Sequence, residues 1–183
     1  MAPITTPSLI LRPFTPDDTP DMWRLSQEEA YRLWLSNQVY GDPAEMASVM
    51  SYLIAQYESP GDPRQGPFVF AIEYAPDRTL IGHVGFSRLD DEVEVGFSIG
   101  EAHQRRGLAT EAVAAASSQV LRALGLERII GVTAVANTAS RRTLVRAGYS
   151  WERDREMNFQ GVVQTVNVYV YRPLRVSHTP SDS

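Results

Sequence analysis

The chain has 183 residues, is 43% hydrophobic and carries a formal net charge of −5 at pH 7, which suits a globular domain and argues against general nucleic-acid binding. It contains no cysteine, which excludes a disulfide framework, a thiolate metal site and a cysteine nucleophile, and its three histidines lack metal-ligand spacing. No apolar run predicts a membrane span and no secretory signal is visible, so we expect a cytoplasmic protein without metal.

The first half of the chain predicts one strand, two helices and three strands. The run T-P-D-D at 15–18 is a helix-start signal, because a capping residue is followed by proline and by acids at the positive end of the helix dipole. A loop rich in Gly and Pro is expected at 59–67. The expected elements are a strand at 8–14, helices at 16–35 and 43–57, and strands at 68–73, 80–87 and 92–99.

The second half predicts a helix, a strand, a second helix and a final hairpin. These elements are expected at 108–124, 128–134, 138–147, 149–158 and 164–171, with a disordered tail at 176–183. Short spacings between the strands of 68–99 indicate antiparallel hairpins. We therefore expect a mixed α/β sheet flanked by helices, held in a single domain at 1–175.

The junction between the strand at 92–99 and the following helix is the most informative stretch. It reads Q-R-R-G-L-A at 104–109, and Gly107 permits close approach of the backbone to a ligand. A first helical turn offers free N–H groups and a partial positive charge, to which Arg105 and Arg106 add two full charges. The junction therefore predicts an anion site suited to a pyrophosphate, with an ordinary helix start as the alternative.

The same six residues resemble the Q/R-x-x-G-x-G/A signature of the GNAT N-acetyltransferase superfamily, with Ala109 in place of the last glycine. The resemblance covers almost the whole chain. L-I-L-R-P-F-T-P-D-D at 9–18, E-V-G-F at 94–97, N-T-A-S at 137–140 and A-G-Y at 147–149 resemble the branch that acetylates ribosomal-protein N-termini. It implies a mixed, mostly antiparallel sheet of about seven strands flanked by four helices, with a splayed strand pair forming the acetyl-CoA cleft.

The resemblance also implies which residues bind acetyl-CoA. Backbone N–H groups of the signature loop would hold the pyrophosphate, and the exposed backbone of 97–99 would pair with the pantetheine arm. Asn137 has a second interpretation as a helix N-cap, and Arg142 as a solvent-facing residue. The expected cofactor-binding residues are Phe97, Ser98, Ile99, Gln104, Arg105, Arg106, Gly107, Leu108, Ala109, Thr110, Asn137 and Arg142.

An amine must be neutral to attack a thioester, so a general base is useful. Glu92 and Glu94 share one face of a strand that leads into the cofactor loop, and they are the expected base candidates, with solvent-facing strand residues as the alternative. The resemblance places Ser140 near the thioester sulfur. Many superfamily members carry a tyrosine acid where this chain has Leu144, which leaves Ser140 as the nearest hydroxyl.

We expect acetyl transfer to a protein or peptide N-terminal amine by direct attack in a ternary complex, since no cysteine can carry an acyl group. The resemblance implies that the helical segment 16–35, which carries Trp23, Tyr31 and Trp34, forms one wall of the acceptor groove, with core packing as the alternative role for at least one of the tryptophans. Alternatives are a small-molecule amine or antibiotic as acceptor, another acyl donor, or a CoA-binding module without turnover. No nucleic-acid or membrane partner is expected, and a homodimer is open.

Overall fold

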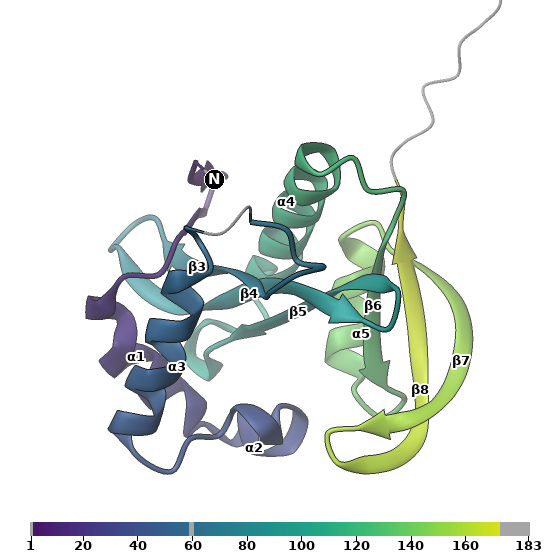
Figure 1. Cartoon of the computed structure of the whole chain (residues 1–183), viewed down its shortest axis with the longest axis horizontal. Coiled ribbons are helices and arrows are strands. Elements are labelled where there is room, and N and C mark those ends of the chain that lie inside the picture. The colour runs from purple at the N-terminus through teal and green to yellow at the C-terminus, as the bar shows by residue number, and fades with distance from the viewer. Residues whose placement is uncertain (1, 59–60, 173–183) are drawn as a thin grey trace, which may run out of the picture.

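An eight-stranded sheet forms the centre of the computed structural model, which describes residues 2–58 and 61–172 (Figure 1). The strand order is β1-β2-β3-β4-β5-β6-β8-β7. The strands are β1 (Ile4–Thr5), β2 (Leu9–Arg12), β3 (Phe68–Tyr74), β4 (Thr79–Leu89), β5 (Glu92–Ile99), β6 (Ile129–Ala134), β7 (Ser150–Phe159) and β8 (Val162–Tyr171). The tail expected at 176–183 lies outside the described residues.

Five α-helices accompany this sheet in the described part of the chain. They are α1 (Thr19–Ser26), α2 (Glu29–Trp34), α3 (Pro43–Ala55), α4 (Leu108–Ala123) and α5 (Thr138–Arg146). Short 3₁₀ turns η1 (Pro16–Asp18), η2 (Ser36–Gln38) and η3 (Glu101–His103) precede α1, follow α2 and precede α4, respectively. None of the helices in the two described ranges has the length and apolar character needed to cross a membrane.

The mixed, mostly antiparallel architecture is confirmed, with one strand and one helix more than expected. The additional strand is β1, which pairs with β2. The additional helix arises because the helix expected at 16–35 is interrupted. Gln27 ends α1 and Glu28 is extended, with φ −67° and ψ 152°, so that α2 begins anew at Glu29.

The parallel contact between β5 and β6 distinguishes the centre of the sheet, since all other neighbouring strands pair antiparallel. Helix α4 is the crossover that a parallel pair requires. Among the described residues, β5 and β6 pair only at Glu94 and Ile130, near the beginning of each strand. The two strands therefore diverge toward their carboxyl ends, which agrees with the expected splayed pair.

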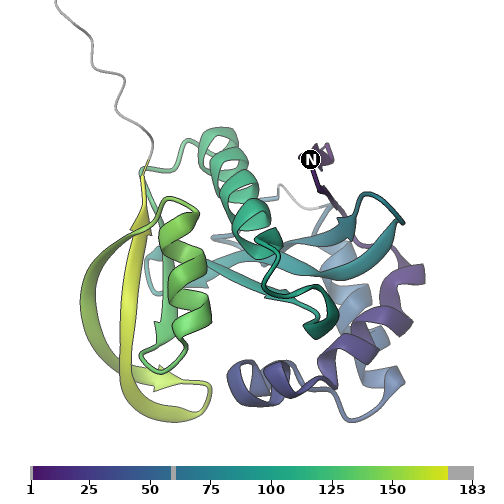
Figure 2. The same cartoon turned by 180° about the vertical axis from the view of Figure 1, so that it is seen from behind.

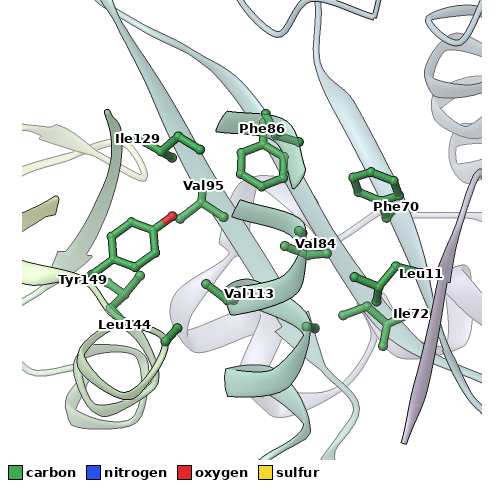
Figure 3. Close-up of a cluster of buried hydrophobic side chains, with 14 of the residues drawn as sticks. Leu11, Phe70, Ile72, Val84, Phe86, Val95, Val113, Ile129, Leu144 and Tyr149 are labelled. Atoms are coloured by element: carbon green, nitrogen blue, oxygen red, sulfur yellow. The ribbon is translucent and has the colours of Figure 1, made fainter. Parts of the chain in front are cut away.

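Helices cover both faces of the sheet, with α4 and α5 on the near side in Figure 2. The larger core lies between α4, α5 and the sheet, and includes Val84, Val95 and Val113 (Figure 3). A second core packs α1, α2 and α3 against Ala71 and Leu80. Side chains of β5 alternate, so Val93, Val95, Phe97 and Ile99 face the core under α4, while Glu92, Glu94, Gly96 and Ser98 lie on the opposite face.

A partly buried ion network ties the expected helix start to the sheet. Arg12 donates to both carboxylate oxygens of Asp18 at 2.8 Å and to Glu73 Oε2 at 2.7 Å. Asp18 also accepts the backbone N–H of Thr15 at 2.7 Å. Burial alone would raise the pKa of Asp18, but the hydrogen bonds from Arg12 and Thr15 outweigh it and hold that pKa below its usual value.

Candidate active site

The loop between β5 and α4 contains two residues with left-handed backbone. Gly107, the residue before the helix, has φ 80° and ψ −3°, and Arg105 has φ 60°. Turns that contain left-handed residues can direct successive peptide N–H groups into an anion-binding concavity. A Cβ added to Gly107 would have no atom within 4 Å, so the loop is open at this residue.

The N-terminus of α4 carries free hydrogen-bond donors. No side chain caps this helix. Within residues 2–58 and 61–172, no acceptor is found for the backbone N–H groups of residues 105–110, and the first satisfied amide is that of Glu111, which bonds to the Gly107 carbonyl. Six donors at the positive end of a 16-residue helix form an arrangement that can hold a phosphate or pyrophosphate.

Two of the expected ligand side chains brace the loop. The Arg106 guanidinium lies 4.7 Å from the centroid of the Tyr74 ring and donates to the Tyr74 hydroxyl. Gln104 Nε2 donates to the carbonyl of Ile99 at 2.9 Å, which ties the loop back to the end of β5. Arg105 is exposed. The loop thus offers mainly its backbone to a ligand.

The face of β5 opposite α4 carries Glu94, Gly96 and Ser98. Burial raises the pKa of Glu94 to about 7, although a hydrogen bond with the backbone of Val132 opposes that shift. Gly96, two residues further along, is exposed, and a Cβ there would meet nothing within 4 Å. A carboxyl group that titrates near neutral pH therefore lies beside an open stretch of strand.

Glu92 has a different environment, although it stands on the same strand face. Its carboxylate accepts two hydrogen bonds from Arg128, one of them from Nε at 2.9 Å. Arg128 also reaches Glu152 at 3.3 Å. This network lies at the start of β5, away from the cofactor loop. The engagement of both Glu92 oxygens argues against its use as a base.

The N-terminus of α5 brings Asn137 and Ser140 together. Asn137 Oδ1 accepts the backbone N–H of Ser140 at 3.0 Å, so the asparagine is a helix N-cap. Ser140 lies one turn before Leu144, which is 1% exposed and contacts Gly131 of β6, so Ser140 also faces the sheet. Arg142 is exposed.

The topology brings these groups to one end of the two central strands, β5 and β6. Helices α4 and α5 each follow a strand of the parallel pair, so both helix N-termini lie at the carboxyl ends of β5 and β6. Crevices of this kind, beyond the carboxyl ends of neighbouring parallel strands, are where open α/β sheets bind ligands. The expected residues 97–110 and 137–142 converge there, whereas Glu92 lies at the other end of β5.

A buried polar cluster at this site was not expected from the sequence. The Tyr31 hydroxyl hydrogen-bonds to Ser98 Oγ, and His83 Nδ1 lies 3.3 Å from the Tyr31 hydroxyl and 3.4 Å from Ser98 Oγ. Burial lowers the pKa of His83 to about 4, so the imidazole is neutral at pH 7. The register of the β4–β5 hairpin, which pairs His83 with Ser98, brings two of these residues together in the structure.

Comparisons with known proteins agree with this geometry. A family model described as an acetyltransferase (GNAT) domain matches residues 8–150. An uncharacterized N-acetyltransferase of Bacillus subtilis, YoaA, is 33% identical over 91% of this chain and 94% of its own length. Two of the solved structures that share the fold hold coenzyme A or acetyl-CoA.

One is a ribosomal L7/L12 alpha-N-protein acetyltransferase, RimL, in complex with coenzyme A. It has a TM-score of 0.78 and 17% identity over 93% of this chain and 98% of its own. The other is the microcin C7 self-immunity acetyltransferase MccE in complex with acetyl-CoA and AMP. It has a TM-score of 0.75 and 16% identity over 91% of this chain and 93% of its own. Structural similarity at this level of sequence identity shows a shared fold alone.

Proposed function

Since the chain belongs to the GNAT acetyltransferase family, we propose that it transfers the acetyl group of acetyl-CoA to the α-amine of a protein or peptide N-terminus. It is an acetyl-CoA-dependent acetyltransferase by family. The observation that carries the residue assignment is the open, uncapped N-terminus of α4 beside the diverging ends of β5 and β6.

The donor site consists mainly of backbone. The free N–H groups of residues 105–110 hold the pyrophosphate of acetyl-CoA, and the hydroxyl of Thr110 adds a donor. The backbone of residues 97–99, where β5 no longer pairs with β6, is free to hydrogen-bond the pantetheine arm. Ile99 and Leu108 are buried and contribute packing from their side chains.

Glu94 is the general base in this proposal. A base works best when its pKa lies near the working pH, and burial brings the pKa of Glu94 to about 7. Its carboxylate attracts a protonated amine to the open strand face at Gly96 and then accepts a proton from it, directly or through water. Glu92 is left out because Arg128 already engages it.

Ser140 assists departure of the thiolate. Leu144 is buried against β6 and carries no proton, so the serine one turn earlier supplies the nearest hydroxyl on that face of α5. A thiol with a pKa of about 8.5 is a good leaving group and needs only a hydrogen bond from Ser140, not full proton transfer. The amine nitrogen forms its bond to the acetyl carbon directly while the carbon–sulfur bond breaks.

Two observations bear on the acceptor. The RimL protein, which shares this fold, is named for acetylating a protein α-amine, and the exposed strand at Gly96 leaves room for a chain end. The fold is shared equally by MccE, whose name is that of an antibiotic self-immunity enzyme, so a small-molecule amine is the second candidate.

A turnover panel tests the proposal. Thiol release from acetyl-CoA is followed with peptides that begin with Ser or Ala, with the same peptides blocked at the N-terminus but carrying a free lysine, and with polyamines and aminoglycosides. Mass spectrometry locates the added acetyl group. We expect transfer to the free α-amine alone. Turnover restricted to the small amines would replace the acceptor assignment, and binding without thiol release from any amine would indicate a non-catalytic module.

A further inference from the structure

We propose that Tyr31 and Glu101 are positioning residues that couple the wall of the acceptor groove to the strand and loop that bind acetyl-CoA. The wall segment, here called the strap, comprises residues 28–38 with helix α2 and turn η2. The inference rests on the proposed function, because it concerns how the two substrate sites communicate. In this proposal Tyr31 and Glu101 contact neither the acetyl group nor the acceptor amine.

The first link joins the strap to the cofactor strand. The Tyr31 side chain is 2% exposed and its hydroxyl hydrogen-bonds to Ser98 Oγ, the middle residue of the stretch that pairs with pantetheine. His83 Nδ1 lies within 3.4 Å of both hydroxyls and supplies a third polar partner. A buried hydroxyl that lost these partners would remain desolvated and unsatisfied, so the geometry of Ser98 and the geometry of α2 depend on each other.

The second link joins the strap to the phosphate-binding loop, through two glutamates that bond reciprocally. Glu28 Oε2 accepts the backbone N–H of Glu101 at 2.8 Å, and Glu101 Oε1 accepts the backbone N–H of Ala30 at 3.2 Å. Each carboxylate thus satisfies an amide at the start of the other's short helix, α2 or η3. Turn η3 runs directly into the loop at 104–107, so the strap and the loop share these bonds.

The packing around this link is tight. A Cβ on Gly100, the residue before η3, would lie 2.6 Å from Leu25 Cδ2 and 3.4 Å from Glu28 Oε1. The absence of a side chain at Gly100 therefore lets the end of α1 and the start of the strap approach the cofactor loop. This end of the strap is held by packing and hydrogen bonds together.

The far end of the strap is held weakly. Ser36 Oγ and the backbone N–H of Asn37 donate to Gln160 Oε1, both at 3.4 Å and both exposed to solvent. Gln160 stands at the tip of the β7–β8 hairpin, and Figure 1 shows α2 close to that tip. The strap is thus tied firmly to the cofactor side of the groove and loosely to the opposite side.

The coupling follows from this asymmetry. Helix α2 has six residues, too few to be stable in isolation, so its position depends on its tertiary contacts. Acetyl-CoA bound to residues 97–99 and to the loop restrains Ser98 and Glu101, and these in turn restrain Tyr31 and Ala30. By linkage, an acceptor that requires an ordered strap binds better when the donor site is filled.

Hydrogen exchange measured by mass spectrometry tests the coupling without an identified acceptor. Exchange of peptides covering 28–38 is compared with and without saturating acetyl-CoA. We expect acetyl-CoA to slow exchange of the strap about fivefold or more in the wild-type protein. In Tyr31→Phe and Glu101→Ala, which remove the hydroxyl and the acceptor oxygen of the two links, calorimetry should still show acetyl-CoA binding, while the cofactor-dependent slowing of strap exchange is lost.

Two matched variants serve as controls. Tyr52→Phe removes a hydroxyl from a tyrosine that is 53% exposed on α3, and it should behave as wild type. Gln160→Ala frees the far end, so exchange at 36–38 should accelerate while α2 keeps its response to acetyl-CoA. This contrast separates loss of the coupling from general loosening of the strap.

The proposal is overturned if Tyr31→Phe and Glu101→Ala retain the wild-type slowing, or if acetyl-CoA binds the wild-type protein without changing strap exchange. A wild-type protein that fails to bind acetyl-CoA in calorimetry would instead contradict the proposed function, and the coupling would fall with it. With the peptide that turns over fastest, Tyr31→Phe should raise the KM for the peptide several-fold more than it lowers kcat. A general loss of folded enzyme would lower kcat and leave the KM unchanged.

Discussion

Two glycines at opposite ends of α4 offer a matched test of the donor loop. Gly107 precedes the helix with φ 80°, and Gly125 follows it with φ 59°. A Cβ added at either residue would meet nothing within 4 Å, so neither alanine variant clashes inside the protein. An L-residue in left-handed backbone costs about 1 kcal/mol, and Gly107→Ala and Gly125→Ala should lower the Tm by a similar amount, about 2–4 °C.

Binding should separate the two variants. A Cβ on Gly107 projects into open space in the middle of the stretch 105–110 whose free N–H groups would hold the proposed pyrophosphate, so we expect it to hinder that approach. Losing one hydrogen bond to a charged group costs about 1.5–3 kcal/mol, which corresponds to about tenfold or more in the Kd for acetyl-CoA. Calorimetry should show this loss for Gly107→Ala and wild-type affinity for Gly125→Ala. Equal affinity in the two variants would refute the assignment of the loop.

Three further variants test separate parts of the structure. Glu94→Gln should abolish the rise of kcat/KM through about pH 7, because the base acts deprotonated, and the variant should gain Tm relative to wild type above that pH, where the wild type buries a charge; an unchanged pH profile counts against the base. Ser140→Ala should lower kcat about tenfold or more while the Kd for acetyl-CoA stays within twofold; unchanged turnover returns Ser140 to a structural role. Asp18→Asn should cost about 2 kcal/mol in urea unfolding at pH 7, since it leaves Arg12 partly unpaired. Because the folded-state pKa of Asp18 is lowered, the stabilisation is present above the unfolded pKa and is lost as the pH falls through the folded one, so the gap should narrow in acid; a constant gap would exclude this charge as its source.

Local patterns were sufficient for most elements. The helix-start signal before α1, the Ala-rich α4 with its flanking glycines, and the N-cap at Asn137 are all set by residues close in sequence, and the structure has each of them. The mixed character of the sheet followed from the order of elements, whereas the parallel pairing of β5 with β6 is seen only in the structure. The cofactor-loop assignment required the family resemblance in addition, because a strand, a glycine and a helix occur together in many folds.

The features that sequence patterns did not predict depend on tertiary contacts. No proline or glycine marks the break at Glu28, whose carboxylate is satisfied by the amide of Glu101, 73 residues away. The alternation of side chains along β5 puts Glu92 and Glu94 on the same face of the strand. Only the contact of Arg128 with Glu92 distinguishes the two carboxylates. The cluster around Tyr31 needs the docking of α2 onto β5, which no periodicity encodes.

Calorimetric titration of the wild-type protein with acetyl-CoA, beside free adenine nucleotides, tests the central claim most directly. The account predicts tight binding that depends on the pantetheine arm, because residues 97–99 and the free amides of 105–110 each contribute. Absence of binding would mean that the start of α4 is an ordinary helix terminus, and the assignment of the donor site would be wrong.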